Sequence, residues 1–245
     1  MKNKTVSLND IQKDYDEFID ACAKFNFYTR SKEIQKGKIK KCEQQVLILK
    51  EYKSQAIDTK DEHTANLLFH FQCMVNSMAA SLRLWVSLKD KNYHDAWCNL
   101  VDAQEYIEVA LKIADYPGIR NMETHLKAME IALFPGWALF NSPGHTETVG
   151  KCSICSAPFV QCEHIENQIY LGRFCQRVDR KIIEAHHSAL VKNPKDRRCI
   201  LTKISGDHGK MIDYFTWEET GEENKDDNNM YVEGVLLSFH QLDLN

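Results

Sequence analysis

The chain has 245 residues, of which 43% are hydrophobic and 27% are charged. That composition is typical of a globular protein, and the length allows one large domain or two small ones. The formal net charge of −4 excludes a generally basic surface, so a nucleic-acid partner would have to bind a local patch.

The first half of the sequence predicts a series of amphipathic helices. Ser7 and Asp10 match a capping box at the start of the first helix. Gly37 interrupts the pattern, and a second helix is predicted after it. The third helix has the clearest pattern, and Asp61 or Thr64 can cap it. Its apolar residues recur at helical spacing: Leu67, Phe71, Met74, Met78, Leu82 and Trp85.

Two more helices complete this half of the sequence. A fourth is predicted from Tyr93 to Ala114, and Pro117-Gly118 stops it. A fifth is predicted from Met122 to Leu133, where Pro135-Gly136 follows. Short connections between amphipathic helices favour an antiparallel bundle of five helices.

After Pro143 the pattern changes to short segments separated by turn residues. Three such segments are Gln168–Val178, Lys181–Val191 and Arg198–Ile204, and Asn193–Asp196 predicts a turn between the last two.

The end of the sequence predicts an acidic loop and a strand. Residues 218–229 contain six carboxylates and one lysine, which predicts a mobile loop. Residues 230–239 predict a strand. The expected fold class is therefore α+β, with an antiparallel helical bundle in residues 1–140 followed by a small β-rich domain in residues 141–245.

Four cysteine and histidine residues lie within thirteen positions of one another in the second domain. Cys152 and Cys155 form a C-x2-C pair, and Cys162 and His164 form a C-x-H pair shortly after it. Thiolates and imidazoles are the donors that Zn²⁺ takes in closed tetrahedral sites. The sequence therefore predicts that these four residues bind one zinc ion.

The predicted zinc ion is structural, because four protein donors leave no open position at which water could be activated. Its effect would be to fold a segment too short to build its own core. Cys175 and His145 are alternative ligands, should one of the four not bind. The other cysteines are predicted to be core residues: Cys22, Cys42, Cys73, Cys98 and Cys199.

The zinc segment resembles one found in scattered bacterial and phage-associated proteins, whose usual form is CSICG, a C-x-H-I pair and Y-x-G-x-x-C. The matching runs are CSIC at 152–155, CEHI at 162–165 and IYLGRFC at 169–175. The resemblance covers roughly residues 134–200. This chain has Ser156 and Asn167 where glycine is usual, which affects the expected local turns but not the ligands. The resemblance implies zinc binding and a bacterial or phage-conflict setting. It implies little about activity, because the activity of most such proteins is unknown.

A second resemblance lies in the helical half, where Arg120, Asn121 and His125 fit the R-x4-6-H pattern of HEPN domains. The resemblance implies a metal-independent ribonuclease that works as a homodimer with two copies of the motif in one cleft. His125 would be the general base or acid at the 2′-OH, Arg120 would hold the phosphate, and Asn121 would orient the site. The alternative is that both charged residues belong to a solvated helix start.

Basic residues gather in residues 24–60 and 171–210. Those in the second stretch are Arg173, Arg177, Arg180 and Lys181 around Cys175, and Arg197-Arg198. They either line a phosphate-binding face or form ordinary solvated faces.

Three functions remain open from these observations. The first is a zinc-stabilised binding or assembly protein that engages a protein or nucleic-acid partner. The second is an HEPN-like ribonuclease with a zinc-binding appendage, and the third is a structural component that forms large homo-oligomers. Residues 1–10 have no apolar segment of a secretory signal and no apolar run is long enough to span a bilayer, so we expect a cytoplasmic protein without a membrane partner.

Overall fold

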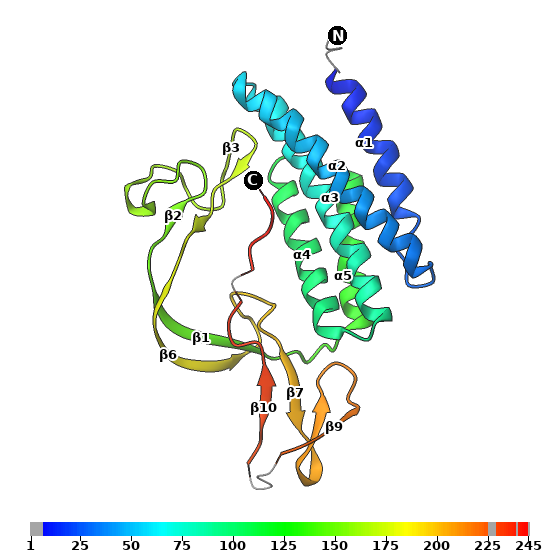
Figure 1. The fold of residues 1–245 in the computed structure, drawn as a ribbon, viewed down its shortest axis with the longest axis vertical. Coiled ribbons are helices and arrows are strands. Elements are labelled where there is room, and N and C mark those ends of the chain that lie inside the picture. The colour runs from blue at the N-terminus through cyan, green and yellow to red at the C-terminus, as the bar shows by residue number, and fades with distance from the viewer. Residues whose placement is uncertain (1–6, 225–228, 239, 245) are drawn as a thin grey trace. The chain divides into compact units, whose positions relative to one another are not determined.

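The computed structural model describes residues 7–224, 229–238 and 240–244 (Figure 1). The predicted α+β class is confirmed, because five helices are followed by short antiparallel strands. The helices are α1 (Leu8–Ala23), α2 (Lys32–Asp58), α3 (Glu62–Lys89), α4 (Tyr93–Leu111) and α5 (Pro117–Leu133). None of these helices carries an apolar stretch long enough to cross a membrane.

The residues just before α1, α3 and α4 each accept a hydrogen bond with their side chain from a backbone N–H of the first helical turn. The predicted capping box of α1 is present, since the Ser7 hydroxyl accepts from the N–H of Asp10 and the Asp10 carboxylate accepts from the N–H of Ser7. Asp61, one of the two predicted caps, accepts from the N–H of Thr64 at 3.1 Å at the start of α3. Such caps stabilise a helix by about 1 kcal/mol each.

Two predicted helix starts were wrong. Helix α2 begins at Lys32 and continues through Gly37, because a glycine in a helix costs only about 1 kcal/mol and the turn around it buries Ile39. Helix α5 begins at Pro117 rather than Met122. Proline is favoured at the first helical position, where its missing N–H would have no helical partner.

Helix α3 is the centre of the bundle and packs against α1, α2 and α4. Most of its length is buried, and Leu68, Phe69, Leu82 and Leu84 are among its inaccessible side chains. Its buried polar groups have partners, as where the Ser77 hydroxyl donates to the Ala103 carbonyl at 2.8 Å. The predicted core cysteines of the bundle are buried at Cys22, Cys42 and Cys73 and half-buried at Cys98.

The chain forms two compact units that are not consecutive in sequence. The first unit combines the chain up to Leu126 with Lys151–Val178 and the segment from Leu242, and the second combines Lys127–Gly150 with Asp179–Gln241. This division differs from the expected split into residues 1–140 and 141–245. The reason is that Lys151–Val178, here called the cysteine module, packs on the helices of the first unit.

The strands are short and mostly pair in twos. The cysteine module contains β2 (Lys151–Cys152) paired with β5 (Arg177–Val178), and β3 (Ile169–Tyr170) paired with β4 (Arg173–Phe174). The second unit contains a ribbon of β1 (Phe140–Glu147) and β6 (Ile182–Val191), and a sheet in the order β10-β7-β8-β9. The strands of that sheet are β7 (Leu201–Ser205), β8 (Lys210–Asp213), β9 (Glu219–Glu223) and β10 (Val232–Gly234).

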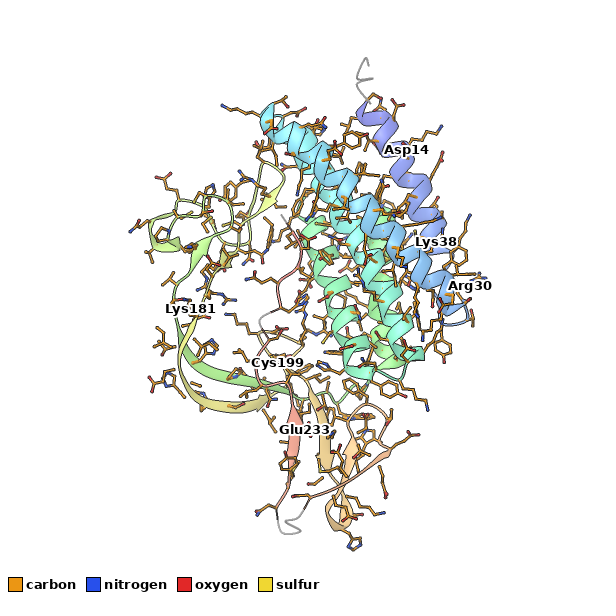
Figure 2. The ribbon with its side chains drawn as sticks, viewed as in Figure 1. Asp14, Arg30, Lys38, Lys181, Cys199 and Glu233 are labelled. Carbon is orange, nitrogen blue, oxygen red and sulfur yellow. The ribbon has the colours of Figure 1, made fainter. Side chains whose placement is uncertain are left out.

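The sequence does not predict strand β1, because Pro143-Gly144 is a dipeptide that usually ends a strand or forms a turn. In the ribbon Pro143 lies opposite Ser188, and each strand of a two-stranded ribbon has one open edge where a missing N–H costs little. Cys199 is buried just before β7, as predicted for a core cysteine (Figure 2).

The acidic stretch 218–229 was predicted to be a loop, but part of it is strand β9. This strand pairs with β8, and lysines offset its charge: the Lys210 ammonium lies 2.9 Å from the Glu219 carboxylate, and the Lys203 ammonium lies 2.8 Å from that of Glu222. Residues 225–228 lie outside the described residues. The strand predicted over 230–239 is confirmed only at β10, and residue 239 is also outside the described part.

One glycine fixes the cysteine module on α3. The N–H of Gly172 donates to the Asn66 side-chain oxygen at 2.7 Å. A Cβ at Gly172 would lie 2.6 Å from the carbonyl oxygen of Ala65, and the residue has a φ of +69°. Both the close approach of the two backbones and the left-handed conformation therefore require glycine.

We expect Gly172→Ala to lower the free energy of unfolding by about 2 kcal/mol or more, because the new methyl group meets helix backbone and the residue is strained at positive φ. The measurement is urea unfolding combined with hydrogen exchange of the module amides. Gly37→Ala is the matched control, since nothing lies within 4 Å of its added Cβ, and it should stabilise helix α2 by about 1 kcal/mol. Equal stability of the two variants would contradict this account of the docking.

Candidate metal centre

The first two cysteines lie on a tight turn at the end of β2. The N–H of Cys152 donates to the Ala157 carbonyl at 2.9 Å, and the N–H of Ser156 donates back to the Cys152 carbonyl at 2.9 Å. The N–H of Ile154 points at the Cys152 sulfur at 3.3 Å. Ser156 closes the turn with a φ of +61°, which explains why glycine would be usual at this position.

The third and fourth donors follow a short 3₁₀ helix at Phe159–Gln161. The N–H of His164 donates to the Cys162 sulfur at 3.2 Å. The imidazole of His164 packs edge-on against the Tyr170 ring, with the ring centroids 4.7 Å apart, and the Tyr170 hydroxyl accepts from the N–H of Ile165 at 2.9 Å. Tyr170 thus holds the imidazole in one orientation.

The four predicted residues come together in space. The donor atoms of Cys152, Cys155, Cys162 and His164 all lie within 4.8 Å of one another, and they form the one such cluster in the part of the chain that the structure describes. The two sulfurs of Cys155 and Cys162 are 3.5 Å apart, and the His164 Nδ1 atom lies 3.8 Å and 3.1 Å from the sulfurs of Cys152 and Cys162.

Two of these separations, at 3.5 Å and 3.8 Å, are close to those in a tetrahedral metal site, and the third, at 3.1 Å, is shorter. With zinc–sulfur bonds of about 2.3 Å and zinc–nitrogen bonds of about 2.0–2.1 Å, two donors of a tetrahedral site are about 3.6–3.8 Å apart. Three thiols and one imidazole also form a common donor set for structural zinc. The cluster could therefore hold a metal ion.

The two alternative ligands have different positions. The Cys175 sulfur is 3.8 Å from that of Cys152, but it does not belong to the set in which all donors are mutually close. His145 lies in strand β1 of the second unit, where its Nε2 atom is 3.5 Å from the Glu147 carboxylate. Cys175 is therefore next to the cluster without being one of its four donors, and His145 is not part of the cluster.

The thiols in the cluster and beside it differ in acidity. Burial raises the pKa of Cys152, but the N–H groups of Cys155 and Ile154 and the neighbouring thiols of Cys162 and Cys155 together lower it to about 6. Burial and the contact with Cys152 raise the pKa of Cys175 to about 12. Backbone N–H groups directed at a sulfur favour the thiolate form that binds metal.

The residues of the HEPN-like motif lie on the first turns of α5. The guanidinium of Arg120 is held between the carboxylates of Asp115 and Glu123, at 2.8 Å and 2.9 Å. These ion pairs raise the pKa of Arg120 and lower that of Asp115. The His125 ring packs edge-on against Phe27 at 5.7 Å between centroids, and Asn121 is exposed. Positions five apart on a helix differ by about 140° in direction, so Arg120 and His125 lie on different faces.

Most of the arginines predicted near the module have acidic or carbonyl partners. Arg177 lies 3.0 Å from the Glu166 carboxylate, and Arg173 donates to the Ile154 carbonyl at 3.2 Å. In the second unit, Arg180 lies 3.1 Å from Glu147 and Arg198 lies 3.0 Å from Asp196. In the other basic stretch, Arg30 and Lys38, which Figure 2 labels, lie 6.0 Å and 5.0 Å from the centre of the Phe25 ring.

No protein-family model matches the chain, and neither a curated protein nor a solved structure matches it significantly.

The metal content should distinguish the ligands from their neighbour. We expect about one metal ion per native chain and Cys155→Ser to reduce that value to nearly zero, because a tetrahedral site that loses a thiolate is incomplete. Cys175→Ser is the control and should keep the metal. Elemental analysis of the purified proteins makes the measurement, and metal loss from Cys175→Ser but not from Cys162→Ser would replace the proposed ligand set.

The turn at Ser156 provides a second prediction. Ser156→Gly should stabilise the module by about 1 kcal/mol, because a side chain at positive φ costs that amount and glycine does not. Ser153→Gly is the matched control, and it should destabilise by about 1–2 kcal/mol through loss of the bonds from the Ser153 hydroxyl to the Phe174 carbonyl and from the N–H of Gln176 to that hydroxyl. Thermal unfolding of the metal-loaded proteins tests this, because the melting temperature should rise in Ser156→Gly and fall in Ser153→Gly.

Proposed function

We propose that this protein is a binding and assembly protein in which a structural zinc ion shapes the cysteine module for a protein partner. Zinc is favoured among metal ions because three thiolates and an imidazole in a tetrahedral arrangement suit a soft or borderline cation. The observation that carries the proposal is the closed set of four donors at Cys152, Cys155, Cys162 and His164.

The closed donor set argues against a catalytic metal. Catalytic zinc sites keep one position for water or substrate, and four protein ligands occupy all positions of a tetrahedral ion. The zinc ion would instead stabilise a module of fewer than 30 residues, and structural zinc contributes on the order of 10 kcal/mol in such cases.

The surface of the module favours a protein partner over nucleic acid. Val160 and Ile165, which flank the Cys162–His164 pair, are 73% and 64% exposed. Exposed aliphatic side chains on a rigid turn are typical of protein interfaces, whereas nucleic-acid interfaces are strongly basic. Arg177, by contrast, is paired with Glu166 and offers less charge to a phosphate. The bacterial or phage-conflict setting rests on the sequence resemblance alone.

The ribonuclease alternative has no comparable support. Arg120 would have to exchange two carboxylates for a phosphate, and His125 would have to meet its counterpart in a second copy of the chain. This alternative remains an outcome of the test below.

Partner capture with point variants tests the proposal. We expect Ile165→Asp to keep one zinc ion per chain but to weaken partner binding at least tenfold, because a carboxylate would be desolvated in an apolar contact. Ile183→Asp, which changes an equally exposed isoleucine in β6, is the control and should bind as the native chain does. Binding is measured by titrating the captured partner against each variant.

Two results would contradict the proposal. The first is tight binding of labelled DNA or RNA that Ile165→Asp leaves unchanged, which would favour a nucleic-acid partner. The second is RNA cleavage in EDTA that His125→Ala abolishes, which would establish the ribonuclease alternative.

A further inference from the structure

The last described residues of the chain, Leu242–Leu244, bind to the helices of the first unit (Figure 1). The N–H of Asp243 donates to the Tyr106 hydroxyl of α4 at 3.1 Å. The carbonyl of Asp243 accepts from the side-chain amides of Gln72 and Asn76 of α3, at 3.3 Å and 3.2 Å. Side chains of two helices thus satisfy both backbone groups of one residue that is in no helix or strand.

The donor at Gln72 is held in place from within the core. Gln72 is fully buried, and its side-chain oxygen accepts from the ammonium of Lys53 at 2.7 Å. Lys53 is itself only 4% exposed, and its ammonium lies 4.8 Å from the centre of the Phe69 ring. Because Lys53 occupies the amide oxygen, the amide nitrogen of Gln72 is the group that faces Asp243.

Two side-chain contacts add selectivity. The carboxylate of Asp243 lies 2.5 Å from the ammonium of Lys50 on α2. Leu244 is 3% exposed, so its apolar side chain is removed from water. Main-chain hydrogen bonds provide affinity for a peptide, and Lys50 together with the buried position of Leu244 favours an acidic residue followed by leucine.

We propose that the helical bundle carries a peptide-binding site for an Asp–Leu sequence, and that the chain's own residues 242–244 occupy this site in cis. The site lies on α2, α3 and α4, so the inference does not rest on the function proposed for the cysteine module. A linked segment has an effective concentration of about a millimolar, so a peptide in trans binds only when that segment is displaced. The segment therefore restricts access to the site.

Release of the segment should open the site to a peptide added in trans. The probe is a fluorescent, amidated peptide with the sequence of residues 238–245, and fluorescence anisotropy measures its binding to the full chain. The native chain should not bind the probe, whereas Leu244→Asp should bind it, because the variant segment no longer competes. Leu236→Asp is the matched control, since Leu236 is exposed outside the site, and it should behave as the native chain does.

The contacts predict how binding to the released site changes. Within the Leu244→Asp chain, Asn76→Ala and Lys50→Ala should each weaken probe binding by about threefold to tenfold, as expected for one exposed hydrogen bond or ion pair. A probe with aspartate in place of the leucine at position 244 should bind at least tenfold more weakly than the native probe, because it cannot fill the apolar contact.

The proposal is overturned if Leu244→Asp keeps its circular dichroism spectrum and yet does not bind the probe, or if the control variant binds it equally well. Should Leu244→Asp lose its helical signal, Asp243→Lys decides the question. The Asp243 side chain is 63% exposed and its charge reversal opposes Lys50 without touching the core. Failure of the folded Asp243→Lys chain to bind the probe overturns the proposal as well.

Discussion

Burial of helix α3 on nearly every side is the constraint on which the first unit depends. A helix that is apolar around most of its circumference must be covered by neighbours, and here α1, α2 and α4 supply the cover. Three polar residues of α3 form hydrogen bonds with segments outside the bundle helices. Asn66 binds the cysteine module, and Gln72 and Asn76 bind the segment at residues 242–244. One helix thus organises the core, the module and the chain's last described residues.

The cysteine module is stabilised from two directions. Its strands contain two residues each, which is too short for a sheet with its own core. Four metal-type donors come together in its turns, and Gly172 fixes the module on α3 by a close backbone approach that leaves no room for a side chain. A metal ion would therefore set the internal geometry, while the helix sets the position of the module in the first unit.

Charge pairing offsets part of the positive charge that the sequence gathers in residues 171–210. Arg177 and Arg180 have carboxylate partners, and the lysines at 203 and 210 offset the acidic strand β9. Such exposed pairs contribute little stability, about 0–1 kcal/mol each. Each pair also lowers the net positive charge around its basic residue.

The sequence by itself determined the helical half, the caps at Ser7 and Asp61, and the grouping of the four metal-type donors. These features depend on neighbours within a few positions, where helical periodicity, capping and ligand spacing are readable. The sequence also led to wrong predictions at Gly37, Pro143 and the acidic strand. Glycine, proline and clustered like charges interrupt a helix or strand only when contacts with the rest of the fold do not offset their cost.

Only the tertiary structure decided which distant segments meet. No local pattern predicts that Gly172 approaches Ala65, or that Asp243 binds Gln72, since these pairs lie more than 100 residues apart. For the same reason the division into 1–140 and 141–245 could not anticipate a module that follows β1 in sequence but packs on α3. Contacts of this kind depend on the shape of the assembled bundle, and that shape follows from burial of α3 rather than from any short motif.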